Sequence, residues 1–212
     1  MLNNLVDKVT PKSAALLVMD IQNDFCADDG FFGRLGRDMK PIQEMVSRLE
    51  KLIEASRKVG VPIFFIKAIY DDVYLSDTIR LRHERNHLPQ NYCIFGTWGA
   101  EFYKIKPLPN EIVIDKHRYN SFTGTNLDTM LRNFGIKTVI CTGTATNVCV
   151  EATAREAYSK DYHVVIVEDC CASSYGREFH EMTLENCRQT FGVVCNSEEL
   201  IKHLERKNVN HS

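Results

Sequence analysis

Six apolar stretches recur along the chain, and most of them are separated by segments with the spacing of an amphipathic helix. The stretches are rich in β-branched residues and nearly continuous in hydrophobicity, which is typical of strands buried on both faces of a parallel sheet. They span residues 14–21, 61–69, 111–116, 138–143, 163–168 and 192–195. Because parallel strands need long crossover connections, this feature favours an α/β topology.

Five segments between and after these strands are expected to be helices, at residues 39–59, 127–134, 148–160, 177–191 and 197–207. In the first, the apolar residues form one stripe at helical spacing, and Gly60 follows as a helix stop. The alternation of strand and helix predicts right-handed βαβ units. We therefore expect an α/β fold, a three-layer doubly wound sandwich with a parallel sheet of about six strands and helices on both faces.

Residues 71–109 break this rhythm, because they form a polar segment that contains several aromatic residues. We call this segment the insertion, and we expect a helix and loops that act as a lid or substrate wall. No internal repeat or low-complexity segment is visible elsewhere. The sequence therefore predicts one domain over residues 1–212.

Charge and hydrophobicity exclude two classes of partner. The 26 basic and 28 acidic side chains give a net charge of −2 without a basic stripe, which argues against binding to nucleic acid. The apolar stretches are far shorter than the ~20 residues that cross a bilayer, which argues against a membrane protein. The N-terminal segment carries an acid and no apolar run, so we expect no signal peptide and a cytoplasmic location.

Eight cysteines are many for 212 residues. Without a signal peptide a disulfide framework is disfavoured, and a zinc site needs clustered pairs, whereas no C-x-x-C motif occurs. We expect most of these thiols to be small apolar core residues, with one or two that carry chemistry.

Ligands bind beyond the carboxyl ends of the strands in an open parallel sheet. Asp20 ends the first strand, Lys116 ends the third, and Cys149 follows the fourth in the first turn of a predicted helix. The helix N-terminus and Lys116 would lower the pKa of the thiol, and Asp20 could accept its proton. Each residue alone has a structural interpretation: a core cysteine, a turn aspartate, a solvated lysine. Their common location favours a catalytic site.

Three sequence blocks around these residues, LLVMDIQNDF, VIDKHRYNSF and TGTATNVCVEATAREA, resemble the signature blocks of the isochorismatase-like cysteine hydrolase superfamily. The resemblance covers about residues 14–195. It implies a catalytic triad of Asp20, Lys116 and Cys149, and a cis peptide between Thr144 and Ala145. It also implies an oxyanion hole formed by the backbone N–H groups of Ala145 and Cys149. Relatives with this fold commonly form dimers or tetramers, so we expect a homo-oligomer.

Differences between this sequence and two subgroups of the superfamily reduce the number of reactions that we expect. Nicotinamidases carry a metal-binding Asp-x-His after the second strand, but here IKAIYDDVYLSD has no histidine. His83 and His87 are four residues apart, as in a zinc pair, yet charged residues surround them and favour a solvated helix. We therefore predict no metal and no cofactor. Isochorismatases proper replace the cysteine, so Cys149 argues against that reaction.

The remaining expectation is hydrolysis of a small-molecule amide or ureide. The second and third blocks are most similar to the branch of ureidoacrylate amidohydrolase, biuret hydrolase and N-carbamoylsarcosine amidohydrolase, which release ammonia from a terminal carbamoyl or amide group. A nicotinamidase-like amide hydrolase is the alternative. Candidate substrate contacts are Phe25 and Trp98 as apolar walls, and Asn23, Tyr119 and Gln189 as polar groups. Core packing for the first two and a surface position for Gln189 are the structural alternatives.

Two hypotheses from other functional classes have less support in the sequence. The many thiols make a redox or binding protein on the same fold conceivable, although the intact triad argues against it. A dinucleotide enzyme is disfavoured because no G-x-G-x-x-G follows the first strand.

Overall fold

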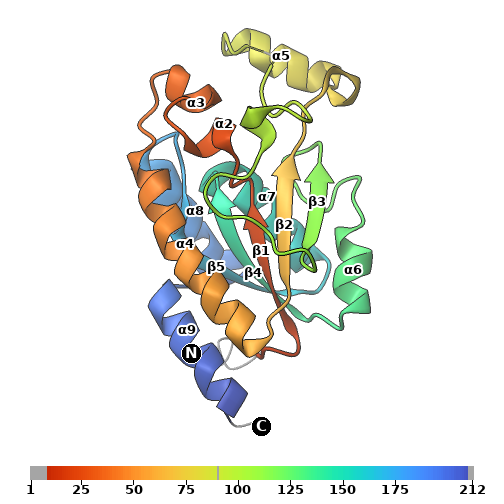
Figure 1. Ribbon diagram of the computed structural model, residues 1–212, viewed down its shortest axis with the longest axis vertical. Coiled ribbons are helices and arrows are strands. Elements are labelled where there is room, and N and C mark those ends of the chain that lie inside the picture. The colour runs from red at the N-terminus through yellow and green to blue at the C-terminus, as the bar shows by residue number, and fades with distance from the viewer. Residues whose placement is uncertain (1–8, 90, 210–212) are drawn as a thin grey trace.

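The computed structural model describes residues 9–89 and 91–209, and its central element is a six-stranded sheet (Figure 1). The strands are β1 (Ala14–Met19), β2 (Ile63–Ala68), β3 (Ile112–Lys116), β4 (Thr138–Thr144), β5 (His163–Ala172) and β6 (Val193–Cys195). They pair in the order β3-β2-β1-β4-β5-β6, and every pairing is parallel. Residues 1–8, on which the expectation about a signal peptide partly depends, lie outside the described residues.

Helices cover both faces of this sheet (Figure 1). On one face lie α4 (Lys40–Val59) and α9 (Ser197–Val209), and on the other α6 (Leu127–Asn133), α7 (Glu151–Ser159) and α8 (Arg177–Thr190). Side chains of β1 alternate between the two cores: Leu16 and Val18 pack on the α4 side, whereas Leu17 and Met19 pack on the α7 side. Burial on both faces explains why β1 is apolar at every position. The predicted α/β sandwich is confirmed.

Two elements differ from the sequence prediction. β5 continues to Ala172, beyond the predicted end at residue 168, because its pairing with β4 resumes after an irregularity at Cys141 and Gly143. The predicted helix 148–160 is an α-helix only from Glu151 onwards, and it is preceded by a π-helical turn, η3 (Thr146–Val150). Both differences lie near the carboxyl ends of the strands.

Most of the insertion lies at the carboxyl end of the sheet, and its last residues, after Ala100, run back to the start of β3 (Figure 1). It contains the short helices η1 (Asp72–Tyr74) and η2 (Trp98–Ala100) and the longer α5 (Asp77–Arg85), and it lies near α2 (Asn23–Cys26) and α3 (Phe31–Arg34). The buried carboxylate of Asp24 connects these parts. It accepts hydrogen bonds from the backbone N–H of Phe31 at 3.0 Å and of Cys93 at 2.7 Å.

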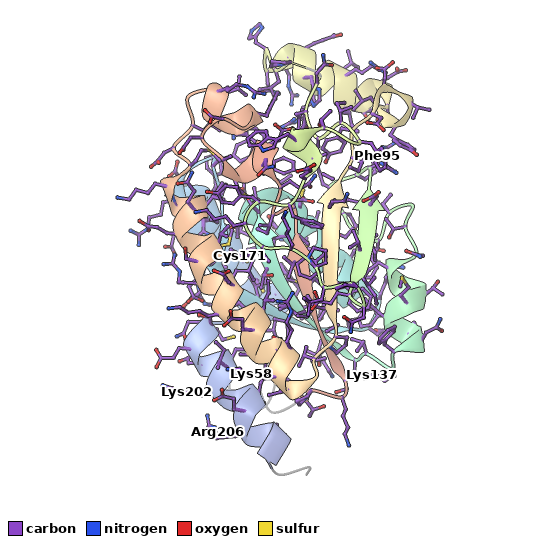
Figure 2. The ribbon with its side chains drawn as sticks, in the orientation of Figure 1. Lys58, Phe95, Lys137, Cys171, Lys202 and Arg206 are labelled. Atoms are coloured by element: carbon purple, nitrogen blue, oxygen red, sulfur yellow. The ribbon has the colours of Figure 1, made fainter. Side chains whose placement is uncertain are left out.

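All eight cysteines are free and buried, as expected for core residues. Charged side chains such as Lys137 and Lys202 lie at the surface (Figure 2). Within the described residues, no helix is both long enough and apolar enough to cross a membrane.

Candidate active site

Three side chains predicted from the strand ends meet in a buried cluster. Lys116, the last residue of β3, places its Nζ 3.0 Å from Asp20 Oδ2 and 3.3 Å from Cys149 Sγ. It also donates a hydrogen bond to the carbonyl oxygen of Arg118 at 3.1 Å. Lys116 is 0% exposed, Asp20 1% and Cys149 6%. The lysine therefore bridges a carboxylate and a thiol in a site nearly closed to solvent.

The loop after β4 brings Cys149 to this cluster. Gly143 has a φ of 115°, and a Cβ there would lie 2.0 Å from the carbonyl oxygen of Met19, so only glycine fits between β4 and β1. The Thr144–Ala145 peptide that follows is cis, as the resemblance implies. Cys149 then lies in the π-helical turn η3, and such turns occur often at functional sites.

The electrostatics differ from the sequence prediction at Cys149. Burial and the charge of Asp20 raise the pKa of the Cys149 thiol to about 12, although Lys116 acts in the opposite direction. The predicted lowering of this pKa is therefore wrong. Burial likewise raises the pKa of the Asp20 carboxyl, with Lys116 opposing the shift. Burial disfavours the cation of Lys116, but the charges of Asp20 and Cys149 outweigh it and raise the pKa of the lysine.

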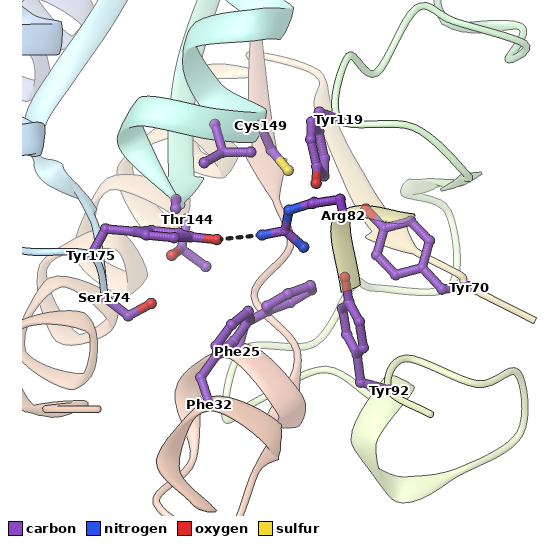
Figure 3. A pocket seen from close by; sticks show the side chains of 12 residues that line it. Phe25, Phe32, Tyr70, Arg82, Tyr92, Tyr119, Thr144, Cys149, Ser174 and Tyr175 are labelled. Carbon is purple, nitrogen blue, oxygen red and sulfur yellow. Dashed lines mark hydrogen bonds between the residues drawn. The ribbon is translucent and has the colours of Figure 1, made fainter. Parts of the chain in front are cut away.

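A narrow cavity of about 30 Å³ opens onto Cys149 (Figure 3). Half of the residues that line it are aromatic: Phe25, Phe32, Tyr70, Tyr92, Tyr119 and Tyr175. Thr144, Ala145 and Val148 complete the wall beside the thiol, and Arg82 reaches the cavity from α5. The mixture of aromatic, hydroxyl and cationic side chains in this wall suits a small molecule with a planar body and polar ends.

The predicted substrate contacts divide into two groups. Phe25 and Tyr119 line the cavity. Asn23 does not, because its amide donates a hydrogen bond to the carbonyl oxygen of Trp98 at 2.7 Å and thereby holds η2. Trp98 itself is 50% exposed, and Gln189 on α8 bonds to Glu185 at 2.7 Å. The structure thus places Asn23, Trp98 and Gln189 outside the cavity, so the prediction that they contact the substrate is not supported.

Sequence reasoning missed more than half of the cavity wall: Phe32, Tyr70, Arg82, Tyr92, Val148, Ser174 and Tyr175. Ser174 and Tyr175 follow β5, so the strand-end rule finds them once the strand is extended to Ala172. Arg82 carries no such signal, since LRHERNH has charged residues on every side.

The predicted solvated helix around His83 is wrong at that residue. His83 is 0% exposed, and its Nε2 lies 3.3 Å from Tyr92 Oη, whereas His87 is exposed. The two imidazoles therefore have different surroundings. Over residues 9–89 and 91–209, no group of three or more His, Cys, Asp or Glu side chains could hold a metal ion. The expectation of a metal-free enzyme stays a prediction.

Comparisons with known proteins place the chain in a family. The isochorismatase domain matches residues 14–199. The ureidoacrylate amidohydrolase RutB of Pantoea ananatis is 31% identical over 173 residues, which cover 76% of this chain and 69% of that protein. Among solved structures, a cysteine hydrolase from Pseudomonas syringae pv. phaseolicola superposes with a TM-score of 0.82 at 25% identity, covering 94% of this chain and 95% of that one.

Two enzymes with different substrates in their names are also similar. The N-carbamoylsarcosine amidase of Thermoplasma acidophilum has a TM-score of 0.69 at 27% identity, covering 87% of this chain and 96% of that one. The nicotinamidase PncA of Bacillus subtilis has a TM-score of 0.73 at 28% identity, covering 87% and 99%. From the domain match over most of its length, the chain belongs to the isochorismatase-like hydrolase family.

Proposed function

We propose that this hydrolase cleaves a terminal carbamoyl or amide C–N bond of a small molecule, with Cys149 as nucleophile and release of ammonia. The observation that carries the proposal is the contact of Lys116 with both Asp20 and Cys149, beside a narrow cavity that aromatic rings line in part. An acid–base group, a cation and a thiol at this spacing are the parts that acyl transfer through a thioester needs.

In the first half-reaction, Asp20 takes the proton of Cys149 while the sulfur attacks the carbonyl carbon. The raised pKa of Asp20 makes it a better proton acceptor than an exposed aspartate, and Lys116 faces the negative charge before and after the transfer. The backbone N–H groups of Ala145 and Cys149 would hold the oxyanion, where one such donor is typically worth about 3–4 kcal/mol. Asp20 then returns the proton to the leaving nitrogen, and the C–N bond breaks to give ammonia and a thioester.

In the second half-reaction, Asp20 removes a proton from a water molecule that attacks the thioester carbon. The C–S bond breaks, and the sulfur recovers its proton from Asp20. The products are a carboxylic acid from an amide, or a carbamic acid from a ureide. Asp20 thus acts as base and then as acid in each half-reaction. It is the carboxylate that fits these roles, because Lys116 holds it beside Cys149 and no Asp or Glu is among the described residues that line the cavity.

The similarity to a ureidoacrylate amidohydrolase favours a ureide as substrate. A simple amide such as nicotinamide is the second candidate, because the fold similarity to a nicotinamidase is of the same order as that to N-carbamoylsarcosine amidase. Formation of a dimer or tetramer, the cytoplasmic location and the role of the insertion as a lid stay predictions.

An ammonia-release assay over ureides, carbamoyl amino acids and nicotinamide tests the reaction, and intact mass after rapid acid quench tests the intermediate. We expect turnover of at least one compound and an adduct on Cys149. Cys149→Ala should lose turnover while keeping its fold. Cys195→Ala on β6 is the matched control, because this thiol is buried to the same degree at 7% exposure and lies outside the cavity. Near-normal turnover by Cys149→Ala would show that the covalent mechanism is wrong.

A further inference from the structure

The cavity contains one cation that the proposed reaction does not use. Arg82 extends from α5, and Figure 3 shows its guanidinium between Tyr175 and Tyr119, on the same side of the cavity as the Cys149 sulfur. The other lining residues are aromatic, aliphatic, hydroxyl or thiol side chains. Among the described residues that line the cavity, Arg82 is therefore the one with a permanent charge.

The guanidinium has polar neighbours but no carboxylate partner among the described residues. It donates a hydrogen bond to Tyr175 Oη at 2.8 Å, and its Cζ lies 5.8 Å from the ring centroid of Tyr119. The groups that act on its charge are the phenols of Tyr175, Tyr119 and Tyr92. By contrast, Arg80 on the same helix pairs with Asp72 at 2.8 Å.

A half-buried cation among aromatic rings has lost part of its hydration without gaining an anion. A planar guanidinium fits a carboxylate through two parallel N–H···O hydrogen bonds, which is the strongest pairing open to it. The phenols beside Arg82 could donate further hydrogen bonds to the same anion. The cavity wall thus contains a site for a carboxylate at Arg82 and the proposed nucleophile at Cys149.

We propose that Arg82 binds a carboxylate group of the substrate, so that the preferred substrates are short ureido or amide acids rather than neutral amides. The proposal rests on the proposed function for the position of the scissile carbonyl, which lies at Cys149. Because Arg82 and Cys149 line one narrow cavity, the carboxylate and the reactive carbonyl belong to the same small molecule. Arg82 is in this sense a specificity-determining residue carried by the insertion.

The test uses two probes, 3-ureidopropionate and propylurea, which has a methyl group in place of the carboxylate. Binding is measured by calorimetry in Cys149→Ala protein, where turnover does not interfere, and KM and kcat are measured with native Cys149. We expect Arg82→Gln to weaken binding of 3-ureidopropionate and to raise its KM, each by about 10- to 100-fold, because the variant loses a pair of charge-assisted hydrogen bonds. Propylurea should change by less than about twofold, and Arg82→Lys should keep part of the preference.

Arg85→Gln is the matched control, because it removes the same charge from an exposed position on the same helix. It should leave both probes unaffected. The proposal is wrong if Cys149→Ala protein binds 3-ureidopropionate no more tightly than propylurea, or if Arg82→Gln weakens both probes equally, which would indicate a structural role. A different outcome would contradict the proposed function alone: protein with native Cys149 releases ammonia from none of the compounds, although Cys149→Ala protein binds 3-ureidopropionate through Arg82 as expected.

Discussion

Replacing Lys116 by methionine removes the cation from the Asp20–Lys116 pair and keeps a side chain of similar length. Lys116 is 0% exposed and Asp20 1%, so the variant leaves a buried carboxylate without its counter-ion. Removing one partner of a buried ion pair typically costs about 3–5 kcal/mol. For a domain of this size 1 kcal/mol corresponds to a Tm shift of about 2–4 °C, so we expect the Tm to fall by roughly 6–20 °C.

The loss should depend on pH in a defined direction. Burial already raises the pKa of Asp20 in the native protein, and without Lys116 the pKa rises further. A carboxyl group whose pKa is higher in the folded than in the unfolded chain binds more protons when folded, so its contribution to stability falls as the pH rises above about 4. The deficit of Lys116→Met relative to the native protein should therefore be smaller at pH 5 than at pH 8.

Urea unfolding at these two pH values measures the effect. Lys67→Met is the matched control, because Lys67 on β2 pairs with Asp115 at 3.5 Å where the two side chains are 19% and 39% exposed. A pair of this kind is worth about 0.2–1 kcal/mol. Adding Asp20→Asn to Lys116→Met should recover much of the loss. If Lys116→Met is as stable as the native protein at pH 8, or its deficit is equal at both pH values, the uncompensated charge is not the cause.

Two further predictions concern the thiol and the metal. Iodoacetamide should modify Cys149 before the other cysteines, slowly and with loss of activity in step, because Cys149 is the one thiol that lines the cavity; peptide mapping that finds Cys26 or Cys170 first would contradict this. Prolonged chelation with EDTA should leave activity unchanged, whereas loss that zinc restores would give His83 and His87 a role that their surroundings do not suggest.

The sequence predicts the layers of this fold well because strands that are buried on both faces are apolar at nearly every position. The ends of elements are less predictable: Cys170 and Cys171 belong to β5, yet the strand could be expected to end at residue 168 because pairing with β4 resumes only after an irregularity. The position of Arg82 in the cavity wall could not be predicted either, because it depends on how the insertion folds over α2. By contrast, the sequence was enough to predict that Asp20, Lys116 and Cys149 lie close together, because each lies at or just after the end of a strand.

The pKa of Cys149 could not be predicted from its place after β4, because it depends on burial and on a neighbour 129 positions away in sequence, Asp20. Burial and the charge of Asp20 raise the pKa of Cys149, so the neutral thiol is the favoured form at neutral pH. A peroxide-sensing cysteine reacts as an accessible thiolate, so the surroundings of Cys149 argue against a redox role for this residue. Amide hydrolysis has no such requirement. Transfer of the proton from Cys149 to Asp20 leaves the total charge of the site unchanged, and Lys116 contacts both groups, so the thiolate need form only when a carbonyl carbon is present to accept the sulfur.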